Sequence, residues 1–190
     1  MKKIPTMFER DWEGTRLVID KLAPGCEWVL VEGLATEKID GTSCLVRDGK
    51  LYKRYDCKKG KTPPPGWEKC EDEPDPITGH WPGWVPVGDG PEDKWHREAF
   101  DTSLPNSTYE LVGPKVQGNP YGLARHIFRP HGERIFYGIP RTFNELRQWL
   151  ADRPQYEGIV FWRNLADPDC DKCKIKRRDF GLPWPVKGVK

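Results

Sequence analysis

The chain has 190 residues, a length typical of one domain, and its 36% hydrophobic and 32% charged residues are typical of a soluble globular protein. No apolar run reaches the roughly 18 residues that a membrane-spanning helix requires, and no apolar stretch of a signal peptide follows Met1. Composition therefore excludes a membrane-spanning protein and favours an intracellular one, with the cytoplasm as the default location.

The net charge of +2 says little about partners, but the distribution of charge says more. Residues 171–190 hold seven Lys or Arg against two Asp, which suits a phosphate-binding face and a solvated basic tail equally. Six cysteines without a secretory signal argue against a disulfide framework. Cys170 and Cys173 have the spacing of half a zinc site, but Cys57 and Cys70 are too widely spaced to complete it well, so ordinary thiols are preferred.

The first predicted strands lie within residues 28–55. The apolar run Trp28–Val31 predicts one strand, and Asp48-Gly49 between two β-rich arms predicts a hairpin with a type I′ turn at 42–55. Residues 56–107 are rich in proline and glycine, which forbids long regular elements. The same stretch is rich in tryptophan, so we predict an ordered insertion with one helix near 92–100. Its tryptophans are Trp67, Trp81, Trp84 and Trp95, which could form a satellite core or stack on bases.

Strand signals resume at 108–112, 125–128 and 134–139. Thr142-x-x-Glu145 has the pattern of a capping box and predicts an amphipathic helix to about Leu150. Residues 158–162 and 172–178 are then predicted as strands. The fold class expected is α+β, with mainly antiparallel sheets, few helices and one domain over 1–190 that carries the 56–107 insertion.

Four short motifs hold the candidate catalytic and binding residues, and each motif alone is a weak indication of function. They are Glu37–Thr42, Tyr109–Pro114, Glu157–Val160 and Lys174–Lys176. A Lys-x-Asp-Gly sequence is more often a plain turn, and alternating lysines often line the outer face of a strand. Together they point to a nucleophilic lysine, because Lys174 and Lys176 would share one strand face, favour loss of the Lys38 proton and neutralise phosphate charge.

Acidic residues in the same motifs supply hard oxygen atoms. Glu110 and Glu157 could accept hydrogen bonds from ribose or bind a metal ion, and Asp40 could orient Lys38 or the metal. A magnesium ion that arrives on a triphosphate needs one or two carboxylates in addition to water. The expected metal ligands are therefore Asp40, Glu110 and Glu157.

In this order, the four motifs resemble those of covalent lysyl-AMP nucleotidyltransferases, and the stretch 35–42 is most similar to the RNA ligase branch. The resemblance covers roughly residues 28–182. The RNA ligase branch includes nick-sealing and RNA-editing ligases. The insertion, with its Gly79–Trp84 segment, resembles a smaller RNA ligase group that occurs in animals and viruses. The resemblance implies an ATP-grasp-like adenylation domain with a nucleotide pocket between its sheets, and ATP with Mg²⁺ or Mn²⁺ as cofactors.

The resemblance also implies roles for individual positions. Lys38 would attack the α-phosphate of ATP and carry AMP to a 5′-phosphate RNA end, which a 3′-OH end would then attack. Glu37 would contact adenine, Glu110 the ribose, and Glu157 the metal. Lys174 and Lys176 would hold the α-phosphate. Arg54 would lie near the phosphate and the 3′-OH end.

Further candidates are less constrained by the motifs. Phe128 is the expected aromatic partner of adenine, with Phe136 as the alternative, although a core phenylalanine is an equal interpretation of either. His126 and His131 are expected to be structural rather than nucleotide-binding. The expected contacts to RNA phosphates are Arg54, Lys58 and Arg177, with Lys59 and Lys61 beside Lys58.

Three alternatives stay open. A guanylyltransferase of the mRNA-capping type and a DNA ligase share the lysine chemistry, and a nucleic-acid-binding module could keep the fold without activity. Fourteen residues follow Lys176, too few for the C-terminal oligonucleotide-binding barrel of many DNA ligases. We therefore expect no such barrel, which weakens the DNA ligase alternative more than the RNA ligase one. An RNA substrate and a monomer are expected.

Overall fold

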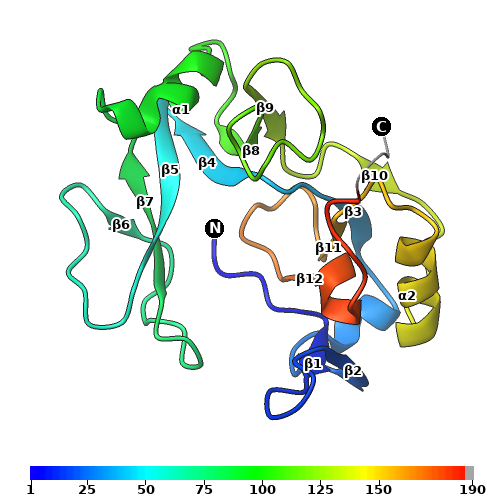
Figure 1. The fold of residues 1–190 in the computed structure, drawn as a ribbon. Coiled ribbons are helices and arrows are strands. Elements are labelled where there is room, and N and C mark those ends of the chain that lie inside the picture. The colour runs from blue at the N-terminus through cyan, green and yellow to red at the C-terminus, as the bar shows by residue number, and fades with distance from the viewer. Residues whose placement is uncertain (187–190) are drawn as a thin grey trace. The chain divides into compact units, whose positions relative to one another are not determined.

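The computed structural model describes residues 1–186, which form two compact units (Figure 1). Unit 1 contains Met1–Lys3 and Asp40–His131, and unit 2 contains Ile4–Ile39 and the chain from Gly132 onward. Most strands pair in an antiparallel manner and there are two short α-helices, which confirms the predicted α+β class. None of the helices among residues 1–186 is long and apolar enough to cross a membrane.

Unit 1 is built on a six-stranded sheet with the strand order β6-β7-β5-β4-β8-β9. Its strands are β4 (Thr42–Arg47), β5 (Lys50–Cys57), β6 (Glu68–Lys69), β7 (Trp81–Pro86), β8 (Ser107–Val112) and β9 (Ile127–Pro130). The predicted hairpin is confirmed, since Asp48 (φ 53°) and Gly49 (φ 69°) connect β4 to β5 with the positive φ pair of a type I′ turn.

The insertion at 56–107 contains more regular structure than its proline content predicts. The predicted helix is present as α1 (Lys94–Ala99) after the 3-10 turn η2 (Pro91–Asp93), but β7 was not expected. The Pro82 carbonyl accepts the Cys70 N–H, so the side of Pro82 that lacks an N–H faces the short strand β6. Pro86, four residues further along the strand, has the same orientation as Pro82. The backbone hydrogen bonds to β5 are therefore made by residues between the two prolines, and the pairing extends over the whole of β7.

The tryptophans of the insertion pack within unit 1. The rings of Trp67 and Trp81 meet edge to face at 5.1 Å, and Trp84 is buried. Trp67 lies directly on Gly83, where a Cβ atom would overlap the indole ring. These contacts support the satellite-core interpretation of the aromatic residues.

One face of this sheet carries the hydrophobic core of unit 1. Cys44, Val46, Tyr109 and Leu111 are buried there, with α1 residues packed against them. His126 belongs to the same structural framework, because its ring stacks on Trp95 at 4.6 Å and its Nε2 accepts the Lys115 N–H. Its Nδ1 lies 2.9 Å from Glu98 Oε1. The expectation of a structural histidine at position 126 agrees with these contacts.

Unit 2 contains a four-stranded sheet with the order β10-β3-β11-β12 and a two-stranded sheet, β1-β2. Its strands are β1 (Phe8–Arg10), β2 (Val18–Leu22), β3 (Leu34–Lys38), β10 (Ile135–Phe136), β11 (Gly158–Trp162) and β12 (Lys172–Lys176). Its helices are α2 (Phe143–Ala151) and the 3-10 turns η1 (Glu27–Leu30) and η3 (Arg177–Phe180). Residues 177–178, predicted to continue the last strand, instead begin η3.

The prediction of a strand at Trp28–Val31 is wrong, because this segment forms the turn η1. Trp28 and Val29 are buried, whereas Leu30 and Val31 are exposed, so burial does not alternate as it does in a half-buried strand. A short apolar run has no periodicity that separates the two conformations. Gly25 and Cys26 lead directly into the turn.

Helix α2 confirms the predicted helix and closes the core of unit 2. Leu146 and Leu150 are fully buried against β11 and β12 residues such as Phe161 and Ile175. At its N-terminus, the Thr142 hydroxyl bonds the Glu145 carboxylate, and neither side chain caps a backbone N–H. The capping box is therefore present as a sequence pattern but not as the reciprocal backbone contacts.

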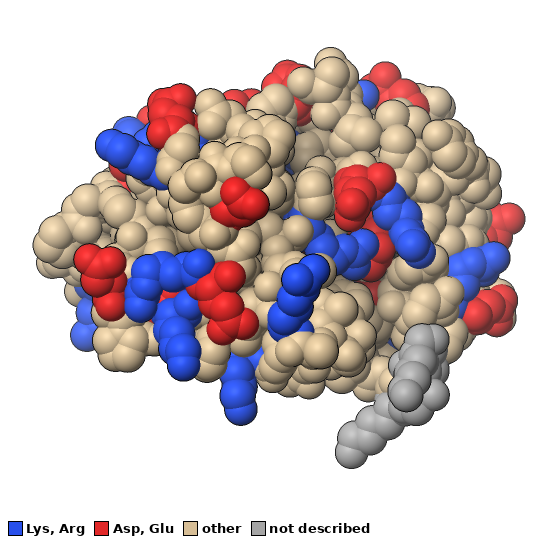
Figure 2. Space-filling view, turned by 90° about the horizontal axis from the view of Figure 1, so that it is seen from above, with Lys and Arg blue, Asp and Glu red and all other residues tan. Residues whose placement is uncertain are grey.

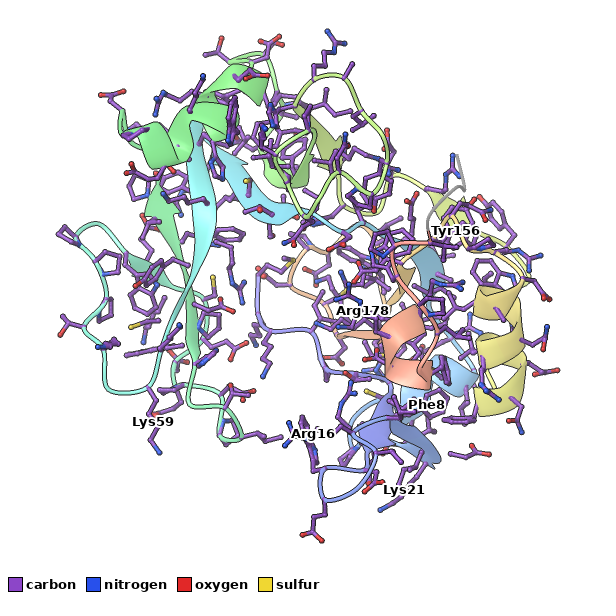
Figure 3. All side chains as sticks on the ribbon, viewed as in Figure 1. Phe8, Arg16, Lys21, Lys59, Tyr156 and Arg178 are labelled. Atoms are coloured by element: carbon purple, nitrogen blue, oxygen red, sulfur yellow. The ribbon has the colours of Figure 1, made fainter. Side chains whose placement is uncertain are left out.

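Aromatic rings complete this core. Phe8, labelled in Figure 3, meets Phe143 edge to face at 5.2 Å, and Phe143 meets Phe180 at 5.1 Å. Tyr156, also labelled, stacks on Trp149 of α2 with an interplanar angle of 12°. Unit 2 thus has a hydrophobic core of its own.

Candidate active site

Three lysines lie on one face of the four-stranded sheet in unit 2. Gly158 on β11 pairs with Lys38 on β3 and with Lys176 on β12, so the two lysines stand in one row across three strands. Lys174 lies two residues before Lys176 and therefore shares its face. Strand alternation puts this face opposite the hydrophobic core, which is lined by Ile159 and Ile175.

Lys38 ends β3 and is held by an ion pair. Its Nζ lies 2.7 Å from Glu157 Oε2 and 3.3 Å from the Ile39 carbonyl oxygen. The side chains of Lys38 and Glu157 are 21% and 9% exposed, so the pair is largely shielded from water. Before Lys38 could act as a nucleophile, its amine would have to lose a proton and leave this carboxylate.

The amine of Lys174, on the same face as this row, is shifted toward its neutral form. Its burial, followed by the positive charges of Lys38 and Lys176, lowers its pKa to about 8. Two like charges near a lysine and loss of water both disfavour the ammonium form, so the causes act in the same direction. A polyphosphate bound here would supply the missing negative charge.

Gly158 occupies a position where the side chain of any other residue would clash with the backbone of β12. A Cβ atom at this position would overlap the Ile175 carbonyl oxygen and lie 2.9 Å from the Lys176 Cα. Both neighbours are backbone atoms of β12, which cannot move without loss of strand pairing. The glycine of the Glu157–Val160 motif therefore keeps Lys176 in register with Lys38 across β11.

Glu37, the predicted adenine contact, precedes Lys38 on β3 and is buried. Its N–H donates to the Arg134 carbonyl at 3.0 Å, and its Oε2 lies 3.7 Å from Arg134 Nε. Alternation along β3 directs Glu37 and Lys38 to opposite faces of the sheet. The Arg134 guanidinium also donates to the Tyr156 hydroxyl at 2.8 Å, so Glu37 lies beside an ordered cation.

Unit 1 carries a second set of predicted site residues in one cross-strand row. Ser43 on β4 pairs with Glu110 on β8, and Glu110 pairs with Arg129 on β9. On the other side of β4, the pairing of Cys44 with Lys53 sets Arg54 opposite Ser43, and Arg54 pairs with Trp84. Directly opposed residues share a face, so these side chains lie on the face opposite the unit 1 core.

Glu110 is buried and bonded to a histidine. Its Oε2 lies 2.7 Å from His131 Nε2, at the end of the β9 segment. Gly41 packs so closely that an added Cβ atom would lie 2.7 Å from Glu110 Cγ and overlap the Leu111 carbonyl oxygen. The glycine of the Lys-x-Asp-Gly motif is thus needed for the close approach of β4 to β8.

Arg54 is ordered by three partners within unit 1. Its Nε donates to Asp56 Oδ1 at 2.6 Å, and its Nη1 donates to the Met1 carbonyl at 2.6 Å. The guanidinium carbon lies 5.7 Å from the Trp84 ring centroid. Its side chain is 16% exposed, so the arginine is held in place in advance of any ligand.

The three predicted metal ligands are divided between the two units. Asp40 and Glu110 belong to unit 1 and Glu157 to unit 2, and Glu157 is engaged by Lys38. Among residues 1–186, no group of three or more His, Cys, Asp or Glu side chains is placed to hold a metal ion. The cysteines in this range form no disulfides, and Cys57 and Cys70 belong to unit 1, whereas Cys170 and Cys173 belong to unit 2.

Both candidate adenine-stacking residues pack in the cores. Phe128 pairs with Leu111 on the core face of unit 1, whereas Glu110 lies on the other face of the sheet. The rings of Phe128 and Tyr109 are 6.0 Å apart. Phe136 on β10 meets Trp149 at 5.1 Å and packs on the unit 2 core. The structural interpretation of each phenylalanine therefore gains support.

The predicted RNA contacts differ in accessibility. Lys58, Lys59 and Lys61 are exposed after β5, and Figure 3 shows Lys59 on the outer side of that loop. Arg177 is 3% exposed and donates to the Leu150 and Pro183 carbonyls, so it stabilises the fold and presents little surface to RNA. Lys187 and Lys190 of the basic C-terminal stretch lie outside the described residues. Basic and acidic side chains are interspersed on the face in Figure 2.

Ser43 and Arg129 lie beside Glu110 in unit 1, although both positions lie outside the ranges of the four motifs. The strand predicted at 125–128 ends before Arg129, whereas β9 extends to Pro130. The sequence could have indicated Arg129 in one way: on a strand, Ile127 and Arg129 point to the face opposite to that of Phe128. Ser43 Oγ is buried and has no hydrogen-bond partner among the described residues.

Comparisons with known proteins agree with the resemblance of the motifs. The family model described as RNA ligase 1 matches residues 97–190, a range that includes Glu110, Glu157, Lys174 and Lys176. RNA ligase 1 of Mus musculus is 29% identical over 229 residues, which cover 80% of this chain and 68% of that protein. RNA ligase 1 of Pongo abelii is 27% identical over 83% of this chain and 70% of that protein, and the Danio rerio protein is 27% identical over 80% and 68%.

Proposed function

Because these comparisons support an RNA ligase family for this chain, we propose that it is an ATP-dependent RNA ligase that works through a covalent lysyl-AMP. The observation that carries the proposal is the row of Lys38 and Lys176 across Gly158, with Lys174 on the same face. A nucleophilic amine surrounded by two phosphate-binding cations suits transfer of an AMP group.

In the first step, the neutral amine of Lys38 attacks the α-phosphorus of ATP. A P–N bond forms, one N–H bond of the amine and the bond from the α-phosphorus to the bridging oxygen break, and pyrophosphate and a proton leave. Lys174 and Lys176 offset the negative charge that develops on the phosphoryl oxygens. Glu157 accepts a hydrogen bond from the resting ammonium group of Lys38 and holds it in place.

In the second step, a 5′-phosphate oxygen of RNA attacks the adenylyl phosphorus and the P–N bond breaks, which regenerates Lys38. In the third, a 3′-OH end attacks the 5′-phosphate, a phosphodiester forms and AMP leaves. The proposal assigns Glu110 to the ribose, Glu37 to adenine and Arg54 to the phosphate of the RNA end. Arg54 is suited to this task because its guanidinium is already ordered.

Mg²⁺ or Mn²⁺ would supply charge neutralisation on the triphosphate when bound. An ion that arrives on the triphosphate needs only one or two protein carboxylates in addition to water. Glu157 is the carboxylate of the lysine row and would be the protein ligand, with Asp40 and Glu110 as further candidates.

The test is label transfer to the protein from α-³²P-ATP or α-³²P-GTP, in the presence of Mg²⁺ and followed by denaturation. We expect an ATP adduct on the wild type, no adduct on Lys38→Ala, and an unchanged adduct on Lys21→Ala, an exposed lysine of the same unit. An adduct with GTP alone would instead indicate the capping-type reaction. No adduct with either nucleotide would overturn the proposal.

The polymer is tested separately with nicked duplexes that differ in one strand. We expect sealing of a 3′-OH and 5′-phosphate RNA nick, monitored by the length of a labelled product. Preferential sealing of an all-DNA nick would assign the same lysine chemistry to a DNA ligase. Binding of RNA without adduct or product would favour the inactive nucleic-acid-binding module.

A further inference from the structure

His131 is fixed against Glu110 at two points within unit 1. Its Nε2 lies 2.7 Å from Glu110 Oε2, and its N–H donates to the Thr108 carbonyl at 3.1 Å. Thr108 and Glu110 both lie on β8, so the backbone and the ring of His131 bind the same strand. The contact joins side chains that are 16% and 11% exposed.

The chemistry of the pair defines the direction of the hydrogen bond. An ionised carboxylate has acceptors alone, so the Nε2–H of His131 donates to Glu110. The other ring nitrogen, Nδ1, is buried and has no hydrogen-bond partner among residues 1–186. A buried polar atom without a partner costs about 1–3 kcal/mol, so the ring orientation is maintained at an energetic cost.

The position of Glu110 explains what this orientation could serve. Glu110 stands in the cross-strand row with Ser43 and Arg129, on the face of the sheet opposite the hydrophobic core. A carboxylate that is held by one oxygen has a defined direction for the other. A fixed acceptor is what selective recognition of a sugar hydroxyl requires.

We propose that His131 is a positioning residue for nucleotide recognition: it holds Oε2 of Glu110 so that Oε1 accepts a hydrogen bond from a ribose hydroxyl of ATP. The inference rests on the proposed function, in which Glu110 contacts the ribose. It adds a residue outside the four motifs and assigns to it selection of the sugar, without contact with the nucleotide.

The test compares ATP with 2′-deoxyATP and 3′-deoxyATP as donors in lysyl-AMP formation at subsaturating nucleotide. The wild type is expected to prefer ATP over at least one deoxy analogue by about tenfold, the factor typical of a lost hydrogen bond to a charged group. In His131→Asn the preference should fall to within about twofold of unity. His131→Gln should retain it, because its amide nitrogen can occupy the place of Nε2 while that of Asn falls near Nδ1.

Glu110→Ala provides the matched comparison. It should lose the same preference, and the double variant with His131→Asn should lose no more than Glu110→Ala alone, because the two residues act on one contact. A general structural defect would lower the use of ATP and of both analogues by equal factors. Thermal unfolding of each variant controls for loss of the fold.

The outcomes separate the inference from the function on which it rests. Without an adduct on the wild type, the proposed function fails. If the wild type forms an adduct and His131→Asn keeps the full preference for ATP, or if the wild type does not discriminate at all, the role of His131 is overturned while the lysine chemistry stands.

Should the asparagine variant fail to fold, ¹⁵N NMR of the wild-type His131 ring replaces it. Addition of ATP is then expected to shift the Nε2 resonance more than addition of the discriminated deoxy analogue. Equal shifts would overturn the inference.

Discussion

Lys174 combines burial with two neighbouring cations, and this combination sets its chemistry at the scale of a single residue. Its pKa is lowered to about 8, first by burial and then by Lys38 and Lys176. Near neutral pH the amine is therefore close to its titration range, whereas an ordinary lysine is fully charged. A site of this kind is prepared to receive negative charge.

We expect ATP binding to be coupled to proton uptake at Lys174. Phosphate oxygens stabilise the ammonium form, so the pKa of Lys174 rises on binding and a fraction of a proton is taken up, about half at pH 8 and little at pH 6.5. Calorimetric titration with ATP in buffers of different ionisation enthalpy measures this number. Lys174→Arg, which stays charged, should remove the uptake at pH 8, and equal uptake in both proteins would contradict the assignment.

Gly158 makes a second prediction at this scale. Gly158→Ala should destabilise the protein by about 2 kcal/mol or more, because the new methyl group meets backbone atoms of β12 that cannot yield. Adduct formation should fall with it, since Lys176 loses its register. Gly88→Ala is the control, as its Cβ atom would approach the Asp93 carboxylate no closer than 3.7 Å. Urea unfolding of the two variants checks the difference.

At the scale of elements, the short helix α1 is attached to the unit 1 sheet by buried charge. Lys53 of β5 pairs with Asp93, which is buried and also accepts the Gly88 N–H at 2.8 Å. His96 of α1 lies 3.7 Å from Asp93, and neither of its ring nitrogens has a hydrogen-bond partner among the described residues. Burial, the largest influence, lowers the pKa of His96 despite the attraction of Asp93.

The sign of the pH effect follows from this lowered pKa. Below about pH 6.5 the unfolded chain binds a proton at His96 more readily than the folded chain, so stability falls as the pH decreases. We expect the urea midpoint of the wild type to drop between pH 7.5 and 5. The drop should be smaller in His96→Leu, whereas His80→Gln in the insertion loop should keep the wild-type profile. An equal drop in the wild type and His96→Leu would contradict this source of acid sensitivity.

At the scale of the whole molecule, the chain enters and leaves unit 1 at a small number of places. Residues 40–131 are continuous within it, and Met1–Lys3 are its one other segment. The contacts of that short segment include the Lys3–Asp75 ion pair and the Met1 carbonyl bound by Arg54. The six-stranded sheet and its core are contributed by the continuous segment.

We therefore expect a fragment of residues 40–131 to fold without the remainder of the chain. It should unfold cooperatively, because it contains the complete sheet and a hydrophobic core. Circular dichroism during urea unfolding measures this, with Tyr109→Ala, which removes a buried core side chain, as the destabilised control. A gradual, non-cooperative signal in the unmodified fragment would show that its stability depends on residues outside 40–131.

The sequence by itself determined the features that rest on local patterns. The type I′ turn at Asp48-Gly49, the strand at 158–162 and the helix after Thr142 are encoded by residue types and spacing, and each is present. The order of the four motifs resembles that of RNA ligases, and the comparisons agree with this resemblance. Lys38, Lys174 and Lys176 were selected from that order, and their roles remain predictions.

Tertiary structure decided what depends on pairing between distant segments. The strand β7 exists because its prolines direct their missing N–H groups away from β5, and the turn at 27–30 exists because Trp28 and Val29 are buried together. Side chains alternate between the two faces of the unit 1 sheet, so Phe128 lies on the core face and Glu110 on the other. The fold places His131 beside the Glu110 carboxylate. Register and burial arise from contacts across many intervening residues, so no window of the sequence contains them.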